Sequence, residues 1–209
     1  MAATEGWLLL EPNYRGSTGY DDQFVNDIRY EIVTRPGNDI LSAVDQLIKD
    51  GIADRTKLTI GGYSYGGVLN NWLITQTTRF NAAVSGAGSI EQVSFWGMQD
   101  IPAYLVSLLG AFPWTNPKLY QNQSAIYYFD RIRTPTHIVA GTNDVQVPLS
   151  QSMMLERGLR YLGIPVELLL LPNEGHPLSN NPWHGKIKVR EEIQWLKLYG
   201  YNSSSIDQK

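Results

Sequence analysis

Short apolar runs alternate with helical patterns over most of the chain. Four runs have the length of strands buried in a sheet, and they cover residues 58–60, 80–85, 136–140 and 166–171. The segments that follow them or lie between them favour helix, at residues 39–49, 68–75, 149–162 and 183–199. Strands that alternate with helices along a chain predict a parallel α/β sheet with helices on both faces.

The chain opens with a further apolar run, GWLLLEP at residues 6–12, which we expect to form a strand buried on both faces. A central strand needs neighbours on both sides, and nothing upstream supplies one. We therefore expect an open sheet edge beside residues 7–10, through which the chain self-associates or pairs with a partner chain. The polar, glycine-rich residues 13–20 form either part of a site or an ordinary connection, and we expect a short helix over 21–30.

Residues 89–128 are the least regular region, and we expect a helical excursion there that covers the site. We expect one domain over residues 1–200 and a polar, disordered tail over 201–209. The length of 209 residues is sufficient for one substantial core.

The composition and charge of the chain limit the classes of partner and of chemistry that it can have. The net charge is −3, the pI is about 5.6 and no run of lysine or arginine occurs, which argues against nucleic acid or an anionic membrane as a partner. The chain contains no cysteine, so thiol catalysis and cysteine metal sites are excluded. Its three histidines lack the spacing of a metal cluster, and we expect neither metal nor cofactor. No signal or transmembrane segment is visible, and we expect a cytoplasmic protein.

A glycine turn joins the strand at 58–60 to a helix that opens at Tyr65. It reads Gly62-Tyr63-Ser64-Tyr65-Gly66, a match to G-x-S-x-G. A strained strand-to-helix corner of this kind exposes a serine hydroxyl, and we expect any side chain at the two glycines to collide with the neighbouring strand or helix. We interpret Ser64 as an acyl-transfer nucleophile, with a purely structural turn as the alternative.

Two more polar residues follow strand ends, Asp144 and His176. The order Ser64, Asp144, His176 is the chain order of an α/β-hydrolase triad, in which a carboxylate orients the imidazole that takes the serine proton. Of the other histidines, His137 is expected in the core and His184 at the surface or in a helix cap. Alternative acids are Asp100, Asp130 and Glu174, but only Asp144 has a strand before it and a turn after it.

The oxyanion hole is predicted only in part. The backbone N–H of Tyr65 is expected to be one donor. The second donor normally comes from a loop after an earlier strand, often built around His-Gly-Gly, and this sequence contains no such loop.

Five motifs in order resemble the catalytic domain of prolyl oligopeptidase-family serine peptidases, in the dipeptidyl-peptidase and acylaminoacyl-peptidase branch. They are Asn13-Tyr14-Arg15-Gly16-Ser17-Thr18-Gly19-Tyr20, Gly61-Gly62-Tyr63-Ser64-Tyr65-Gly66-Gly67, Ser94-Phe95-Trp96-Gly97, Gly141-Thr142-Asn143-Asp144 and Glu174-Gly175-His176. The resemblance covers about residues 6–200 and implies an α/β-hydrolase fold that cleaves peptide or acyl-amino-acid bonds of small substrates. It also implies the catalytic roles of Ser64, Asp144 and His176, and a substrate pocket lined by Tyr63, Tyr65, Trp96 and Val147.

The sequence departs from that family at its start. Family members usually carry a β-propeller and the first hydrolase strands, whereas this chain begins part-way through such a domain. We therefore expect an N-terminally truncated α/β-hydrolase fold, either as a fragment or completed by another chain. Two alternative functions follow: an esterase of the same fold, or a binding subunit that keeps the triad without a complete oxyanion hole.

Overall fold

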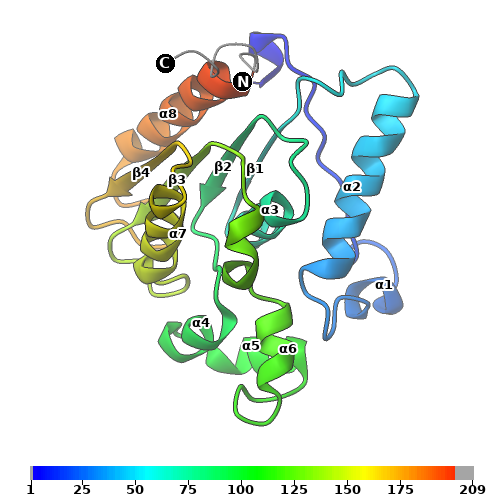
Figure 1. Ribbon diagram of the computed structural model, residues 1–209. Helices are drawn as coiled ribbons and strands as arrows, with labels where there is room; N and C mark the ends of the chain where they lie inside the picture. The colour runs from blue at the N-terminus through cyan, green and yellow to red at the C-terminus, as the bar shows by residue number, and fades with distance from the viewer. Residues whose placement is uncertain (1, 201–209) are drawn as a thin grey trace.

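The computed structural model describes residues 2–200 and contains a four-stranded parallel sheet (Figure 1). The order of the strands in the sheet is their order in the chain: β1 (Thr59–Tyr63), β2 (Ala82–Gly86), β3 (Thr136–Gly141) and β4 (Val166–Leu171). The predicted α/β class and parallel sheet are confirmed. Because all four strands are parallel, their carboxyl ends meet at one edge of the sheet, where such folds place their sites.

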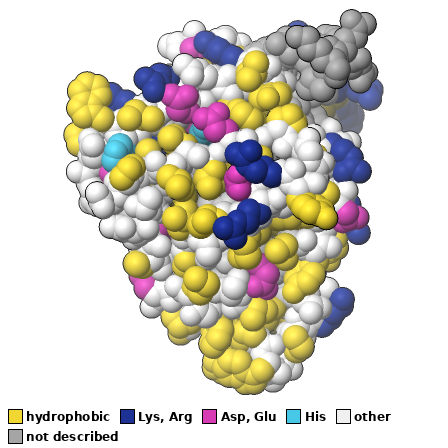
Figure 2. Space-filling view, turned by 60° about the vertical axis from the view of Figure 1, so that its left-hand side comes forward, with side chains coloured by type: hydrophobic (Ala, Val, Ile, Leu, Met, Phe, Trp, Pro, Cys, Tyr) yellow, Lys and Arg dark blue, Asp and Glu magenta, His cyan; other side chains and the backbone are white. Residues whose placement is uncertain are grey.

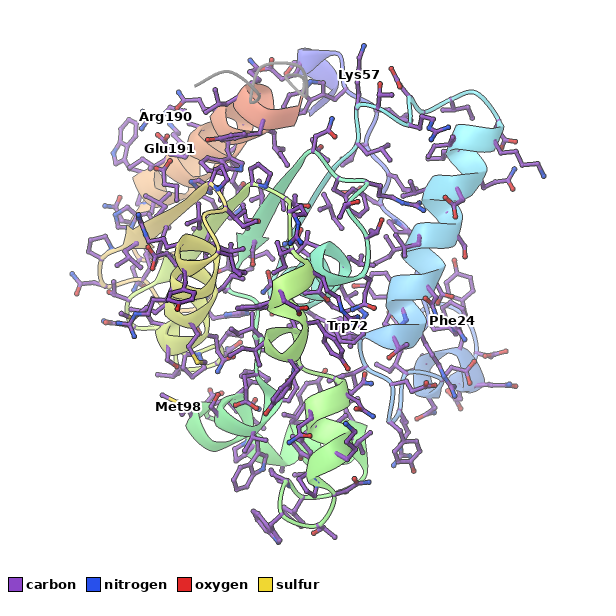
Figure 3. The ribbon with its side chains drawn as sticks, in the orientation of Figure 1. Phe24, Lys57, Trp72, Met98, Arg190 and Glu191 are labelled. Atoms are coloured by element: carbon purple, nitrogen blue, oxygen red, sulfur yellow. The ribbon has the colours of Figure 1, made fainter. Side chains whose placement is uncertain are left out.

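Helices cover both faces of the sheet. On one face, α3 (Tyr65–Gln76) and α7 (Leu149–Tyr161) bury their apolar side chains against alternate strand residues such as Ala83 and Ile138. The other face carries α8 (Pro182–Gly200), whose Trp195 lies against the ring of His137 at 5.8 Å between centroids. The Trp72 side chain fills the space between α3 and α2 (Thr34–Lys49), as Figure 3 shows.

His137 occupies the predicted core position in β3. It is 1% exposed, and neither of its ring nitrogens has a hydrogen-bond partner among residues 2–200. Burial lowers the pKa of His137 to about 4, against a smaller raising effect of Glu191. The imidazole is therefore neutral at pH 7 and packs in the core beneath α8.

The irregular region is a set of short helices. Figure 1 shows α4 (Gln92–Met98), α5 (Pro102–Leu109) and α6 (Pro117–Asn122) gathered below the sheet, and the 3₁₀ turn η2 (Ala125–Arg131) leads back to β3. Buried amides fasten this region to the core. The Gln151 side chain of α7 accepts the Ile90 N–H at 2.9 Å and donates to the Ser94 hydroxyl at 3.0 Å, which leaves none of these polar groups unpaired.

Residues 6–12 do not form the strand that their apolar run predicts. The segment leaves the 3₁₀ turn η1 (Ala2–Glu5) and runs toward α1 (Asp22–Asn26) as an irregular trace (Figure 1). Its Leu8 and Leu9 are 61% and 63% exposed. A strand requires a hydrogen-bonded neighbour, and residues 6–12 pair with none of the four strands of the sheet.

The polar residues 13–20 are tied to a helix that begins earlier than predicted. α2 starts at Thr34, five residues before the expected 39. Pro36 is tolerated in its first turn, because the N–H group that proline lacks would have no acceptor within the helix there. The Arg15 guanidinium binds the Asp39 carboxylate of α2 through two nitrogens, with Nη2 at 2.7 Å from Oδ1. This pair holds the loop against α2. Burial alone would raise the pKa of Asp39, but the hydrogen bonds and the charge of Arg15 outweigh burial and leave this pKa below its ordinary value.

The described residues 2–200 contain no helix that is both long and apolar enough to span a membrane. The predicted disordered tail, 201–209, lies outside the described residues.

The corner between β1 and α3 is packed without side chains. A Cβ added to Gly62 would lie 2.3 Å from backbone atoms of Gly66, and one added to Gly67 would lie 2.4 Å from the Gly86 carbonyl oxygen. A Cβ added to Gly66 would have no atom within 4 Å apart from its chain neighbours and the nearby backbone of its own helix. The predicted collision therefore holds for Gly62, and it is wrong for Gly66, because Gly66 faces open space.

These contacts predict opposite effects for the two motif glycines. Gly62→Ala should cost about 2 kcal/mol or more of unfolding free energy, because the backbone at the corner must move. Gly66→Ala should be neutral or stabilise by up to about 1 kcal/mol, because alanine favours a helix over glycine. Urea unfolding of both variants measures the difference, and an equal loss in both would show that the corner is not set by this contact.

The open sheet edge lies at β1 and not beside residues 7–10, where it was expected, because those residues form no strand, and we expect the β1 edge to pair with another strand. Because the Leu58 carbonyl accepts from Asn81 and the Ser64 N–H donates to Gly86, the intervening Thr59 and Gly61 direct their N–H groups away from β2. We expect self-association through this edge, seen as concentration-dependent mass in sedimentation equilibrium.

Two substitutions at one position test the edge. Thr59→Pro removes an outward N–H without removing a bond to β2 and should shift the protein toward monomer, whereas Thr59→Val keeps the N–H and should not. A wild-type protein that stays monomeric at every concentration would contradict the expectation.

Candidate active site

The corner after β1 holds Ser64 in a backbone conformation that residues other than glycine seldom adopt. Its φ is +56° and its ψ is −120°, and its N–H donates to the Gly86 carbonyl at 2.9 Å. Such conformations cost about 1–3 kcal/mol and persist only where the surroundings impose them. The glycine-lined contacts of β1, α3 and β2 provide that restraint and present the hydroxyl at the carboxyl edge of the sheet.

Asp144 and His176 converge on this hydroxyl from the ends of β3 and β4. His176 Nε2 lies 2.8 Å from Ser64 Oγ, and His176 Nδ1 lies 2.7 Å from Asp144 Oδ2. The three side chains predicted as a triad therefore form one continuous hydrogen-bonded chain. They come together because each follows the carboxyl end of a parallel strand.

The Asp144 carboxylate is fully buried but well partnered. Its Oδ1 accepts the backbone N–H of Gln146 at 3.0 Å and of Val147 at 2.8 Å, while Oδ2 faces the imidazole. An ionised carboxylate only accepts, so His176 must carry its proton on Nδ1. Nε2 is then left free to accept the proton of Ser64, which is what a hydroxyl nucleophile requires.

The first turn of α3 supplies donors beside the serine. The first intrahelical bond runs from Val68 N–H to the Ser64 carbonyl at 3.0 Å, so the N–H groups of Tyr65, Gly66 and Gly67 have no acceptor within the helix. The Tyr65 N–H therefore stands where the sequence predicted an oxyanion donor, next to the nucleophile.

The loops that carry Asp144 and His176 are bonded to each other. The Asn143 N–H donates to the Glu174 carbonyl at 2.9 Å, and the Asn173 N–H donates to the Thr142 hydroxyl at 2.8 Å. A Cβ added to Gly141 would lie 2.4 Å from the Glu174 carbonyl oxygen. The loops of Asp144 and His176 are thus held as one unit. In the motif Gly141-Thr142-Asn143-Asp144, only the glycine is a sequence signal of this close approach.

Tyr63 supports the histidine. Its hydroxyl donates to the His176 backbone carbonyl at 2.7 Å, its ring lies 5.4 Å from the imidazole, and burial raises its pKa above the ordinary value. The predicted substrate-binding role of Tyr63 fits this geometry poorly, because the hydroxyl is already engaged on the histidine side of the site.

The other predicted pocket residues lie apart from Tyr63. Val147 is buried beside Asp144, to which its N–H donates. The Tyr65 hydroxyl donates to the Ile32 carbonyl, and both Tyr65 and Trp96 pack against the same apolar cluster. Trp96 also lines an open hollow of about 250 Å³, whose walls are Trp96, Pro102, Ala103, Val106 and Phe112.

Aromatic rings extend from this hollow onto the surface. Trp114, 68% exposed, stacks on Phe112 at 4.7 Å and meets Trp96 edge-on at 5.3 Å. Figure 2 shows hydrophobic side chains gathered at the lower end of the molecule, at the height where Figure 1 draws α5 and α6. The hollow is thus an apolar recess reached from solvent.

His184 does not occupy the predicted surface or capping position. Its side chain is 15% exposed, and Nδ1 lies 2.7 Å from the buried Glu174 carboxylate. Glu174, an alternative candidate for the triad acid, is bonded to His184 and not to His176. Among the described residues 2–200, no three histidine or carboxylate groups lie together as a metal site would need.

Comparisons with known proteins identify the family of this chain. The family model of the prolyl oligopeptidase family matches residues 1–200. The uncharacterized peptidase YuxL of Bacillus subtilis is 32% identical over 210 residues, which cover 100% of this chain and 31% of that protein. The acylamino-acid-releasing enzyme of Arabidopsis thaliana is 32% identical, with 83% of this chain and 24% of that enzyme covered.

Solved structures show the same fold. The acylaminoacyl peptidase of Pyrococcus horikoshii superposes with a TM-score of 0.84 at 26% identity, over 88% of this chain and 31% of its own. A puromycin-hydrolyzing peptidase of Mycobacterium tuberculosis gives a TM-score of 0.81 at 30% identity, over 90% of this chain and 28% of its own. The chain thus spans about a third or less of these relatives. It has the α/β-hydrolase fold and belongs to the prolyl oligopeptidase family, whose members are serine peptidases.

Proposed function

We propose that this chain is the hydrolytic domain of a serine peptidase that cleaves acyl-amino-acid or short peptide bonds through an acyl-enzyme. The observation that carries the proposal is the hydrogen-bonded chain from Ser64 Oγ through His176 to Asp144, with steps of 2.8 Å and 2.7 Å. Three polar side chains from separate loops, aligned at these distances with their acid buried, have the arrangement of a nucleophile, a base and an orienting carboxylate.

The first half of the reaction forms the acyl-enzyme. As Ser64 Oγ attacks the substrate carbonyl, its proton passes to His176 Nε2, and the buried Asp144 stabilises the imidazolium that results. The oxyanion develops next to the first turn of α3, where the Tyr65 N–H can donate to it. His176 then gives the proton to the leaving amine, which departs.

The second half repeats these steps with water. His176, neutral again, takes a proton from a water molecule that attacks the ester carbonyl, and Ser64 leaves with that proton restored. The same groups serve both halves because the order of the three side chains is unchanged.

Within this proposal we assign the apolar recess to a hydrophobic residue of the substrate, because Trp96 in its wall packs against the same apolar cluster as Tyr65, the residue next to Ser64. Its walls are formed by apolar side chains of α4, α5 and the turn that follows, without a charged group among them. A recess of this kind gains affinity from burying apolar surface and gives a free carboxylate no partner. The relatives named for releasing acylated amino acids or hydrolysing puromycin are consistent with such a substrate class.

Paired substrates test the proposal. We expect hydrolysis of an N-acetyl-phenylalanine p-nitroanilide, and faster hydrolysis of the matching p-nitrophenyl ester because the ester has the better leaving group. Ser64→Ala should reduce both rates by roughly 10⁴-fold or more, and Asp144→Asn by roughly 10⁴-fold because the imidazole then prefers the wrong tautomer.

The control is Ser42→Ala, at an exposed serine on α2. It should leave both rates unchanged. Hydrolysis of the ester alone would favour an esterase, and hydrolysis that survives Ser64→Ala in a folded protein would refute the proposal.

A further inference from the structure

A second buried carboxylate–imidazole pair lies beside the proposed triad. Glu174 precedes His176 by two residues, and His184 belongs to the first turn of α8. The Glu174 side chain is fully buried, and its Oε1 is 2.7 Å from His184 Nδ1. A buried carboxylate is costly unless hydrogen bonds and charges compensate it, so its position next to the site requires a reason.

The carboxylate closes the loop that carries His176. Its Oε2 accepts the Asn180 N–H at 2.9 Å, and its Oε1 accepts the Asn181 N–H at 2.7 Å in addition to the His184 ring. Burial by itself would raise the pKa of Glu174, but the bonds from Asn180, His184 and Asn181 outweigh it and hold this pKa below its ordinary value. The Glu174 carboxylate therefore joins the beginning of segment 174–184 to its end through hydrogen bonds.

The backbone of the same residue reaches the acid of the triad. The Glu174 carbonyl accepts the N–H of Asn143, the residue before Asp144, at 2.9 Å. Glu174 is thus bonded through its carbonyl to the loop of Asp144 and through its carboxylate to the loop of His176 and the start of α8. No other residue in the described part of the chain is seen to join these three segments.

We propose that Glu174 and His184 are positioning residues that hold the His176 imidazole in line between Asp144 and Ser64. Beyond its two triad bonds, His176 is anchored through its own backbone carbonyl to Tyr63. The loop around it depends on the buried carboxylate to keep its shape. Displacement of a catalytic group by about 1 Å can cost about 100-fold in rate, so a loosened loop is enough to impair the base. The kinetic part of this inference rests on the proposed function.

The chemistry of the pair suggests matched variants. Glu174→Gln keeps the shape but turns an NH₂ group toward a backbone N–H, because an amide has only one acceptor oxygen. His184→Leu removes the ring donor. His184→Asn replaces it, because the amide nitrogen of asparagine can stand near the position of Nδ1. The control is Glu156→Gln on α7, a carboxylate that pairs with Arg160 away from the site.

The first readout needs no hydrolysis. Buried imidazole N–H groups bonded to carboxylates give separate downfield proton resonances, and we expect one from His176 and one from His184. Asp144→Asn assigns the first and His184→Leu the second. Glu174→Gln should shift or broaden the His176 resonance, and His184→Leu should have a smaller effect of the same kind. His184→Asn should restore the resonance of the wild-type protein, and the control Glu156→Gln should leave it unchanged.

The second readout is kinetic. In the anilide assay, Glu174→Gln should lower kcat by about 10- to 100-fold with KM little changed, and His184→Asn should recover most of what His184→Leu loses. A merely structural role would lower the melting temperature without this difference between kcat and KM. If Glu174→Gln fails to fold, the two His184 variants still carry the comparison.

The two proposals fail differently. An unaltered His176 resonance and unaltered kcat in folded Glu174→Gln would overturn the positioning role while leaving the hydrolase intact. A wild-type protein that shows both resonances, loses that of His176 in Glu174→Gln and hydrolyses neither substrate would refute the proposed function alone.

Discussion

The close approach of α3 to the carboxyl ends of β1 and β2 is the constraint on which the site depends. Gly67 lies so near the Gly86 carbonyl that a Cβ would come within 2.4 Å of it, and Gly62 meets Gly66 equally closely. Backbone packed on backbone leaves the chain a single route from strand to helix. That route places Ser64 at a positive φ, directly before the first turn of α3, whose N–H groups have no acceptor within the helix.

Asp144 and His176 are positioned by the same sheet, through the pairing of β3 with β4 and hydrogen bonds between the loops that follow these strands. Parallel pairing of β3 with β4 brings the loops after both strands together, and hydrogen bonds from Asn143 and Asn173 join those loops across their tips. The loops that carry Asp144 and His176 are therefore held together as one unit. Glu174 extends that unit to α8, which gives the imidazole a support independent of its own catalytic bonds.

Sequence reasoning succeeded where a local pattern determines the outcome. The strand β4 has the bounds that the sequence predicts, 166–171, because an apolar run with turns at both ends leaves little choice. The order of Ser64, Asp144 and His176 could be read from polar residues that follow strands. Such reasoning failed for residues 6–12, since an apolar run does not reveal whether a neighbouring strand is present to pair with it.

Contacts between distant side chains were also missed. The partnership of Glu174 with His184 arises only when the loop between them closes, and the buried amides of Gln123 and Gln151 bond backbone groups 90 and 61 residues away. A polar residue in the sequence reads as exposed unless its partner is known. These positions therefore had no signal, although they hold the helical region and the histidine loop in place.

The proposed function requires that Ser64 be an activated nucleophile in this chain. The most direct measurement is reaction of the purified, folded protein with a fluorophosphonate, followed by peptide mass spectrometry to locate the adduct. We predict a covalent adduct on Ser64, because His176 Nε2 lies 2.8 Å from the hydroxyl that it must deprotonate. An unlabelled Ser64 in a protein that melts cooperatively would contradict this prediction.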